Sequence, residues 1–166
     1  GTGAKVESVF LDQYYHAGAA LPAPTSTKPY VGGFSKSFES GVFHQVLHFD
    51  VVSLYPSLIL QIGENPRGDS LGIFLPTLRR VRELRLEFKR LAREAEDEGL
   101  RREYDARQAS FKILINSFYG YLGFAGARFG DVDLAARITE AGRALLHDLI
   151  ARFGKAGCRV LEADTD

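Results

Sequence analysis

The clearest pattern of apolar and polar positions lies between residues 77 and 98. Apolar residues recur there at helical spacing and form one stripe along Val81, Leu84, Phe88 and Leu91. Thr77 suits the N-cap and Gly99 suits the C-terminal end, so the pattern predicts a helix over 77–98. A second helix, predicted over residues 102–120, should run antiparallel to the first because the connection is short.

A third long helix is predicted over residues 131–153. Asp131 or Asp133 suits its start, and Gly154 is expected to follow its end. Between the second and third helices, four glycines should break regular structure: Gly120, Gly123, Gly126 and Gly130.

Shorter segments complete the helical part of the prediction. Pro56 suits the first turn of a short helix over residues 56–62. Apolar residues within the first twenty suggest a short helical anchor: Val6, Val9, Phe10 and Leu11. Residues 21–29 contain three prolines and indicate a linker, whereas the glycines of residues 63–72 indicate a loop.

Three stretches predict β-strands. A buried strand that ends near Asp50 is indicated by a run of apolar residues, namely Phe43, Val46, Leu47, Phe49, Val51 and Val52. Residues 30–38 alternate and contain two adjacent glycines, which suggests a strand with a bulge or a close backbone approach. Residues 158–163 predict a strand that leads into Asp164.

Composition narrows the class of protein only slightly. The 166 residues suit one or two small domains, and the 45% that are apolar can form a core. The formal net charge is zero, so there is no global signal for nucleic acid, although local patches could still bind it. Cys158 is the single cysteine, which excludes an internal disulfide and fits a reducing compartment. There is no signal peptide pattern and no apolar run of about 18 residues, so no membrane contact is expected.

Chemistry is concentrated in three blocks. The first runs from Asp50 to Ser57 with the sequence DVVSLYPS, the second runs from Lys112 to Gly120 with the sequence KILINSFYG, and the third is the terminal DTD of residues 164–166. The first and last place carboxylates at strand ends, where carboxylates can share divalent metal ions. In the second, Lys112, Asn116 and Tyr119 recur at helical spacing and share a face that Gln108 continues. Taken singly, each block could instead be a capped turn, a solvated helix face or a solvated terminus.

In this order the blocks resemble motifs A, B and C of the B-family DNA polymerases, and the resemblance covers residues 4–166. It implies an α+β fold, with a partial antiparallel palm sheet, two long antiparallel fingers helices and a further palm helix. The implied division is a lead-in and linker (1–29), a first palm part with motif A (30–74), fingers with motif B (75–120) and a second palm part ending at motif C (121–166). The implied activity is DNA-directed DNA synthesis, in replication or repair, from dNTPs on primer–template DNA.

The carboxylates are the expected catalytic residues. Two metal ions about 4 Å apart can activate a primer 3′-hydroxyl and neutralise the leaving pyrophosphate. Asp50 and Asp166 are the expected ligands of two Mg²⁺ ions, which Mn²⁺ could replace, with Asp164 beside them. Alternation along a strand would put Asp164 and Asp166 on one face unless the turn between them twists.

The nucleotide is expected to lie between the first and second blocks. Backbone N–H groups in the turn at Ser53 and Leu54 can donate to phosphate oxygens. The resemblance implies that Tyr55 packs under the incoming sugar and excludes a 2′-hydroxyl; alternatively, Tyr55 fills the core. It also assigns nucleotide binding to Lys112 and Asn116, and the base-pair side to Tyr119 and Gly120.

A row of cations on the first long helix would suit a triphosphate: Arg82, Arg85, Lys89 and Arg93. The resemblance matches only Arg85 and Lys89 to nucleotide contacts. The alternative is an ordinary solvated face, paired with Glu83, Glu87, Glu94 and Glu96. Tyr30, Gly32 and Gly33 belong to a Y-x-G-G segment that resembles one on the family's template side. The four histidines show no metal-ligand spacing and are interpreted as structural or surface residues.

Some features depart from the family pattern. Glu162 replaces the usual aromatic residue before the third block, and residues 61–75 form a shorter segment than usual. Both favour an alternative, a catalytically silent polymerase-like module that binds DNA or serves as a scaffold. Tyr55 within S-L-Y-P-S argues against an RNA-synthesising or reverse-transcribing palm enzyme.

The extent of the chain also carries an expectation. Because the chain starts at Gly1, lacks methionine and has nothing after Asp166, we expect a piece of a longer protein whose exonuclease and thumb lie elsewhere. Alone, this piece is expected to be inactive. The expected location is the cytoplasm, at the nucleoid if the source is prokaryotic.

Overall fold

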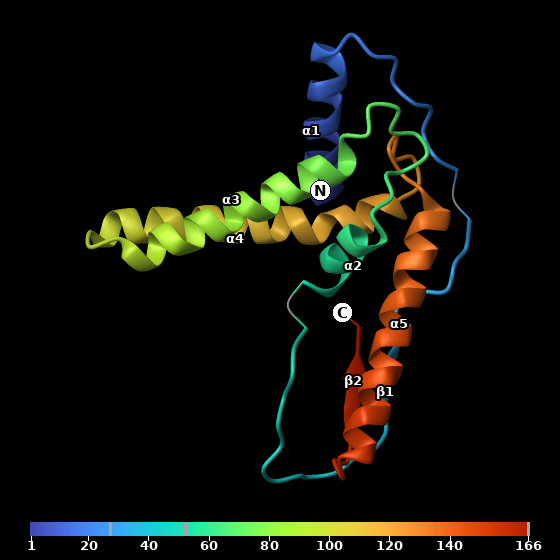
Figure 1. Ribbon diagram of the computed structural model, residues 1–166, viewed down its shortest axis with the longest axis vertical. Coiled ribbons are helices and arrows are strands. Elements are labelled where there is room, and N and C mark those ends of the chain that lie inside the picture. Colours follow the sequence, from blue (N-terminus) through green and yellow to red (C-terminus); the bar gives the residue numbers. More distant parts are fainter. Residues whose placement is uncertain (27, 52, 166) are drawn as a thin grey trace.

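The computed structural model describes residues 1–26, 28–51 and 53–165. In this part of the chain, helices and a small sheet follow one another in the order α1 (Thr2–His16), β1 (Ser35–Ser37), α2 (Leu54–Ile62), α3 (Phe74–Glu94), α4 (Glu98–Leu122), α5 (Val132–Lys155) and β2 (Glu162–Asp164). Helices α3 and α4 form a long hairpin that projects from the rest of the molecule, while α5 runs beside the two strands (Figure 1). The predicted α+β class, with two long antiparallel helices, a further helix and an antiparallel strand pair, is confirmed.

The core lies where α1 crosses the base of this hairpin (Figure 1). Val6, Phe10 and Tyr14 recur every four residues of α1 and are fully buried. The ring of Phe10 stacks on Phe74 of α3 at 5.4 Å and meets Phe118 of α4 edge-on at 5.8 Å. The helical anchor predicted near the N-terminus is therefore confirmed, and it holds the hairpin through aromatic packing.

The ends of α3 differ from the prediction. The helix begins at Phe74, not at Thr77, because the buried carboxylate of Asp69 accepts the Phe74 backbone N–H at 2.8 Å. The same carboxylate accepts the hydroxyl of Tyr14 at 2.8 Å, so this helix start is built by tertiary contacts. The hydroxyl of Thr77 instead accepts a hydrogen bond from Gln13 at 3.2 Å.

The turn between α3 and α4 also lies elsewhere than expected. Asp97 caps α4 by accepting the Leu100 N–H at 2.8 Å, so Gly99 lies in the first turn of α4 and does not end α3. Gly120 lies inside α4, which ends at Leu122 with Gly123 as its C-cap. The linker of residues 21–29 and the loop of residues 63–72 have no helix or strand among their described residues, as predicted.

Helix α5 lies within two residues of its predicted bounds at each end. Asp131 is its N-cap and accepts the Leu134 N–H at 3.0 Å. The helix continues to Lys155, so Gly154 lies in its last turn instead of after it. Helix α2 begins two residues earlier than predicted, with Pro56 in its first turn.

The strand predicted over residues 43–52 is wrong for the described residues. Residues 43–51 form no strand, and Leu47 and Phe49 are 79% and 68% exposed. A strand needs a neighbour for its backbone groups, and in the described part β1 and β2 pair only with each other. The segment instead bows away from the sheet (Figure 1), and Phe49 packs its ring on Phe153 of α5 at 5.2 Å. Val52 lies outside the described residues.

The two observed strands are shorter than the predicted ones. Within residues 30–38 only Ser35–Ser37 is a strand, and β2 starts at Glu162 instead of Cys158. They pair antiparallel, with Ser35 opposite Asp164. No helix in the described part of the chain combines the length and apolar character that crossing a membrane requires.

Candidate active site

Three tyrosines from distant parts of the chain meet beside α5, and we call them the tyrosine cluster: Tyr30, Tyr55 and Tyr119. Tyr55, in the first turn of α2, stacks on Tyr119 of α4 with ring centroids 4.1 Å apart and an interplanar angle of 10°. The hydroxyls of Tyr30 and Tyr119 lie 3.4 Å apart. Residues of the first and second sequence blocks are therefore in direct contact, together with the Y-x-G-G segment.

Hydrogen-bond direction within the cluster is set by α5. Thr139 is fully buried and donates its hydroxyl proton to the Ala135 carbonyl at 2.6 Å. Its oxygen, 3.0 Å from the Tyr119 hydroxyl, must then accept from Tyr119, whose oxygen in turn accepts from Tyr30. Burial, followed by the hydrogen bond to Tyr119, raises the pKa of Tyr30 well above its ordinary value. Tyr30 therefore keeps its hydroxyl proton at physiological pH and can donate it to Tyr119.

Glycine leaves room for this arrangement at two positions. A side chain on Gly123 would collide with the Tyr30 hydroxyl. A Cβ on Gly33 would collide with the Thr165 hydroxyl and lie 2.8 Å from the Tyr55 hydroxyl. Gly33, predicted on the template side, therefore lies against the proposed sugar selector and the third block, whereas a Cβ on Gly32 or Gly120 would meet open space.

The third block is anchored through its middle residue. Thr165 is buried, its hydroxyl accepts the Phe34 N–H at 2.9 Å, and its own N–H donates to the Phe34 carbonyl at 2.9 Å. Asp164 is exposed at the end of β2 and accepts the Ser35 hydroxyl at 3.1 Å. Because Thr165 is anchored in this way, the neighbouring Asp164 carboxylate faces solvent at the end of β2.

The predicted metal ligands are only partly placed. Asp50 is exposed in the segment before α2, Asp164 ends β2, and Asp166 lies outside the described residues. Among the residues that are described, no group of three or more His, Cys, Asp or Glu side chains could hold a metal ion. The donor chemistry nevertheless fits Mg²⁺, because Asp50 and Asp164 present carboxylate oxygens that water can reach.

On α3, the row Arg82, Arg85, Lys89 and Arg93, which we call the cationic face, takes part in no ion pair between described residues. Glu83 and Glu94 pair instead with Arg80 and Arg90, which lie outside this row. Arg85 donates to the Ser53 hydroxyl at 3.4 Å, while its buried Nε has no hydrogen-bond partner in the part of the chain that the structure describes. Ser53 lies at the left-handed turn before α2, with φ of 55°.

On α4, Lys112 and Asn116 are exposed on the face that leads to Tyr119. Nearby cations of this helix are paired, Arg102 with Glu98 at 3.5 Å and Arg107 with Glu103 at 2.6 Å, whereas Lys112 forms no ion pair with a described residue. Phe88 of α3 stacks on Phe111 of α4 at 5.7 Å, which brings the neighbouring Lys89 and Lys112 to the same level of the hairpin. Positive charge is thus available along both helices.

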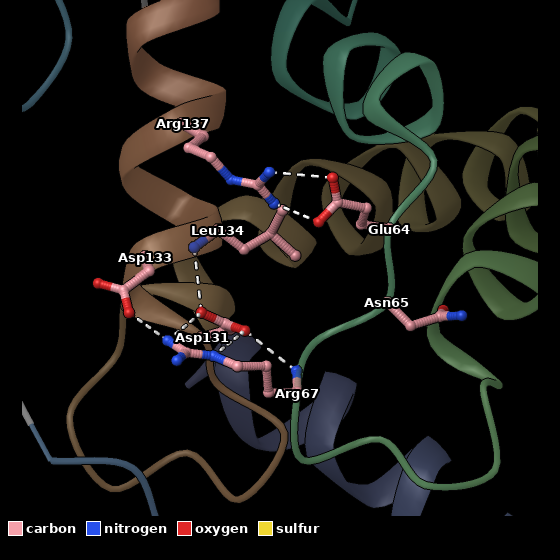
Figure 2. Close-up of a pocket in the computed structure, with 7 residues that line it drawn as sticks. All are labelled: Glu64, Asn65, Arg67, Asp131, Asp133, Leu134 and Arg137. Atoms are coloured by element: carbon pink, nitrogen blue, oxygen red, sulfur yellow. Dashed lines mark hydrogen bonds and ion pairs between the residues drawn. The ribbon is translucent and has the colours of Figure 1, made fainter.

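A network of ion pairs, absent from the sequence-based prediction, connects the loop after α2 to the start of α5 (Figure 2). Arg67 contacts Asp131 through its backbone N–H at 3.0 Å and its Nε at 3.2 Å, and it also pairs with Asp133. Arg137 pairs with Glu64, at 2.9 Å for one of the two contacts. These side chains line a pocket of about 250 Å³, where three carboxylates face two arginines and each charged group takes part in an ion pair. Only the N-cap role of Asp131 could be foreseen, because the partners lie more than 60 residues away.

This network predicts an acid-sensitive contribution to stability. Burial alone would raise the pKa of Asp131, but hydrogen bonds from Arg67 and Leu134 outweigh it and lower the pKa below its ordinary value. A lowered folded-state pKa stabilises the fold above the unfolded-state value of about 3.9, and that contribution is lost as pH falls through the folded-state pKa. Asp131→Asn is expected to cost about 2 kcal/mol at pH 7, with the gap from wild type closing toward pH 2 in urea unfolding.

Asp133→Asn is the matched control. Asp133 pairs with the same arginine but its side chain is 55% exposed, so the cost should stay below about 1 kcal/mol. Equal losses for the two variants would contradict the assignment of the effect to the buried carboxylate.

Comparison with known proteins agrees with this geometry. The sequence model of DNA polymerase family B matches residues 69–163. The chain is 30% identical to DNA polymerase 1 of Pyrococcus abyssi, over 99% of this chain and 25% of that protein. It is 30% identical to the DNA polymerase of Thermococcus gorgonarius over the same shares. It is 31% identical to the DNA polymerase alpha catalytic subunit of Xenopus laevis over 82% of this chain and 11% of that protein.

A solved structure extends the similarity to the whole fold. The family B DNA polymerase from the hyperthermophilic archaeon Pyrobaculum calidifontis matches all of this chain and 26% of its own, with a TM-score of 0.79 and 26% identity. The chain spans about a quarter of the length of the archaeal relatives that it matches. With the family model covering more than half of the residues, and with whole-chain similarity in sequence and structure, the chain belongs to family B of the DNA polymerases.

Proposed function

We propose that this chain is the palm-and-fingers part of a DNA-directed DNA polymerase, which transfers nucleotides from dNTPs to a primer 3′-hydroxyl. The observation that carries the proposal is the contact between Tyr55 and Tyr119, because it joins the motif A turn to the motif B helix. Both arms of the α3–α4 hairpin carry cations that form no ion pair with a described residue. A nucleotide site needs both a surface for the sugar and base and positive charge for the triphosphate.

The proposed roles follow the positions of the side chains. Lys112, Arg85 and Lys89 bind triphosphate oxygens, with Asn116, Ser53 and Leu54 completing the nucleotide site. Tyr55 lies under the sugar, and Tyr119 and Gly120 lie at the nascent base pair. Tyr30, Gly32 and Gly33 contact the template strand, where glycine lets phosphates approach the backbone.

The carboxylates of Asp50, Asp164 and Asp166 would hold two Mg²⁺ ions, or Mn²⁺ in their place. When bound, such ions lower the pKa of the primer hydroxyl and neutralise charge on the leaving pyrophosphate. The Thr165–Phe34 hydrogen bonds hold the backbone beside Asp164 at the end of β2, and the Ser35 hydroxyl donates to its exposed carboxylate.

Other parts of the polymerase are proposed partners of this chain. The exonuclease and thumb would lie in the three quarters of the relatives' length that the chain does not match. Primer grip would come from there, so we expect the chain alone to be inactive. The proposed division keeps residues 1–29, 30–74, 75–120 and 121–166 as lead-in, palm, fingers and palm. We propose that the polymerase acts on DNA in the cytoplasm.

Primer extension by the full-length polymerase tests the proposal. With primed template, four dNTPs and Mg²⁺, we expect extension whose added bases follow the template. A folded wild-type protein that binds primer–template but adds no nucleotide, with Mg²⁺ or with Mn²⁺, would contradict the proposal. Such a protein would be the silent DNA-binding module that Glu162 and the short segment around residues 61–75 favour.

The tyrosine cluster predicts a change of sugar selectivity. Tyr55→Ala in the full-length polymerase should improve rNTP use relative to dNTP use on the order of 10- to 100-fold, because the ring that a 2′-hydroxyl would meet is removed. Tyr55→Phe keeps the ring and its stack on Tyr119, so selectivity should stay near wild type. Single-turnover incorporation of matched dNTP and rNTP measures the ratio. An unchanged ratio in Tyr55→Ala would remove the sugar-selecting role.

A further inference from the structure

Residues 30–34 connect the tyrosine cluster to the sheet without regular structure of their own. At one end, Tyr30 contacts Tyr119; at the other, Phe34 exchanges hydrogen bonds with Thr165. The Val31 side chain is 70% exposed, so the segment has no apolar anchor at that position. Tyr30 packs against the core, and the Phe34 ring meets His147 of α5 edge-on at 4.7 Å, so both ends of the segment are anchored. Between these ends, the Val31–Gly32 backbone depends on polar contacts.

One arginine on α5 supplies such contacts. The Nη1 of Arg143 lies 2.9 Å from the Val31 carbonyl and 2.6 Å from the Gly32 carbonyl. Nη1 carries two hydrogens, so it can donate to both carbonyls at once. Both bonds have a charged donor, which makes them stronger than neutral hydrogen bonds. Within the described residues, no other side chain donates to these two carbonyls.

On its other side the segment is enclosed. Gly33 lies against the Tyr55 and Thr165 hydroxyls so closely that a Cβ there would collide. Residues 31–34 thus lie between Arg143 on one side and Thr165 of the third block on the other. Two of these four residues are glycines, which add no side-chain packing. Without Arg143, the conformational freedom of Gly32 and Gly33 would let the backbone move.

The face of α5 that carries Arg143 also supports the rest of the cluster. Thr139, Gly142 and Arg143 are spaced by three and four residues and therefore lie together. Thr139 accepts from Tyr119, and Gly142 faces the Tyr55 ring, whose Cε1 would lie 3.4 Å from a Cβ there. Each tyrosine of the cluster is thus positioned, directly or through its neighbours, by one short stretch of α5.

We propose that Arg143 is a positioning residue that holds the Val31–Gly32 backbone against α5 and thereby keeps Tyr30 and Gly33 in place beside Tyr119 and Tyr55. The consequence of this positioning for nucleotide selection rests on the function proposed above. The structural part of the proposal, that Arg143 orders residues 31–34, does not depend on that function.

Arg143→Met tests the role, because methionine keeps much of the aliphatic length and removes the donor. Arg152→Met is the matched control, since Arg152 lies on the same helix and, among the residues that the structure describes, pairs only with exposed Asp148. In the full-length polymerase, Arg143→Met should speed amide hydrogen exchange at residues 31–35 by about tenfold and lower dNTP-over-rNTP discrimination by about tenfold. The urea midpoint should match that of Arg152→Met, because Arg143 is at the surface. Arg143→Lys, which retains a charged donor, should recover part of both effects.

The outcomes separate this proposal from the proposed function. If Arg143→Met exchanges at residues 31–35 like Arg152→Met, the positioning role is wrong, whatever the enzyme does. Faster exchange with unchanged discrimination would overturn the consequence for selectivity. If wild type does not extend primers, the proposed function fails, and the exchange comparison still decides whether Arg143 positions the segment.

Discussion

Asp50→Asn is expected to reduce primer extension by the full-length polymerase about 10³-fold or more, while its affinity for primer–template stays within about twofold. The side chain is exposed and takes part in no core contact, so the loss should not come from unfolding. Asparagine keeps the shape but removes the negative charge that holds a divalent ion. Several kcal/mol of metal-dependent stabilisation of the transition state corresponds to a loss of this size.

The measurement is single-turnover extension across a range of Mg²⁺ and Mn²⁺ concentrations, with DNA affinity measured in parallel. Asp12→Asn, an exposed carboxylate on α1 outside the proposed site, should behave like wild type. Extension by Asp50→Asn within about tenfold of wild type would contradict the assignment of Asp50 as a metal ligand.

Phe10→Ala is expected to lower the free energy of unfolding by about 4 kcal/mol. Phe10 is fully buried and its ring contacts the rings of Phe74, Phe118, Tyr121 and Phe129. Truncation removes apolar burial and leaves a cavity that the surrounding rings, fixed on two helices and a loop, can only partly fill. The effect also concerns function, because Phe74 and Phe118 belong to the hairpin that carries the cationic face.

Tyr15→Ala provides the comparison, since it truncates an aromatic residue of the same helix that is 83% exposed. Its cost in urea unfolding should be below about 0.5 kcal/mol. Should Phe10→Ala fail to fold, Phe10→Leu should still fold and lose about 1.5 kcal/mol. Equal stability of the Phe10 and Tyr15 variants would show that α1 is not part of the core.

Local signals explain what could be predicted of the fold. Asp131 caps α5 with its own side chain, so the helix start could be seen in the sequence. The start of α3 could not, because its capping carboxylate, Asp69, lies five residues before Phe74 and is oriented by Tyr14 of α1. The apolar run in residues 43–51 matches a strand pattern, but pairing decides strand formation and no partner is present in the described residues.

In the candidate site too, local sequence signals could be predicted, whereas contacts between distant elements could not. Helical spacing placed Lys112, Asn116 and Tyr119 on one face, whereas the resemblance to family B suggested where that face belongs. Neither could predict the stacking of Tyr55 on Tyr119 or the hydrogen bond from Tyr119 to Thr139, because both depend on how α2, α4 and α5 pack. The metal-binding role of Asp50, Asp164 and Asp166 stays a prediction.

The most direct test of the account is dNTP affinity in a complex of the full-length polymerase with primer–template DNA. Lys112→Ala removes a cation that forms no ion pair with a described residue, whereas Arg102→Ala removes one on the same helix that is paired with Glu98. If α4 presents Lys112 to the triphosphate, Lys112→Ala should raise the apparent Kd for dNTP about tenfold or more, and Arg102→Ala should leave it unchanged. Equal Kd values for the two variants would contradict a triphosphate site on this helix.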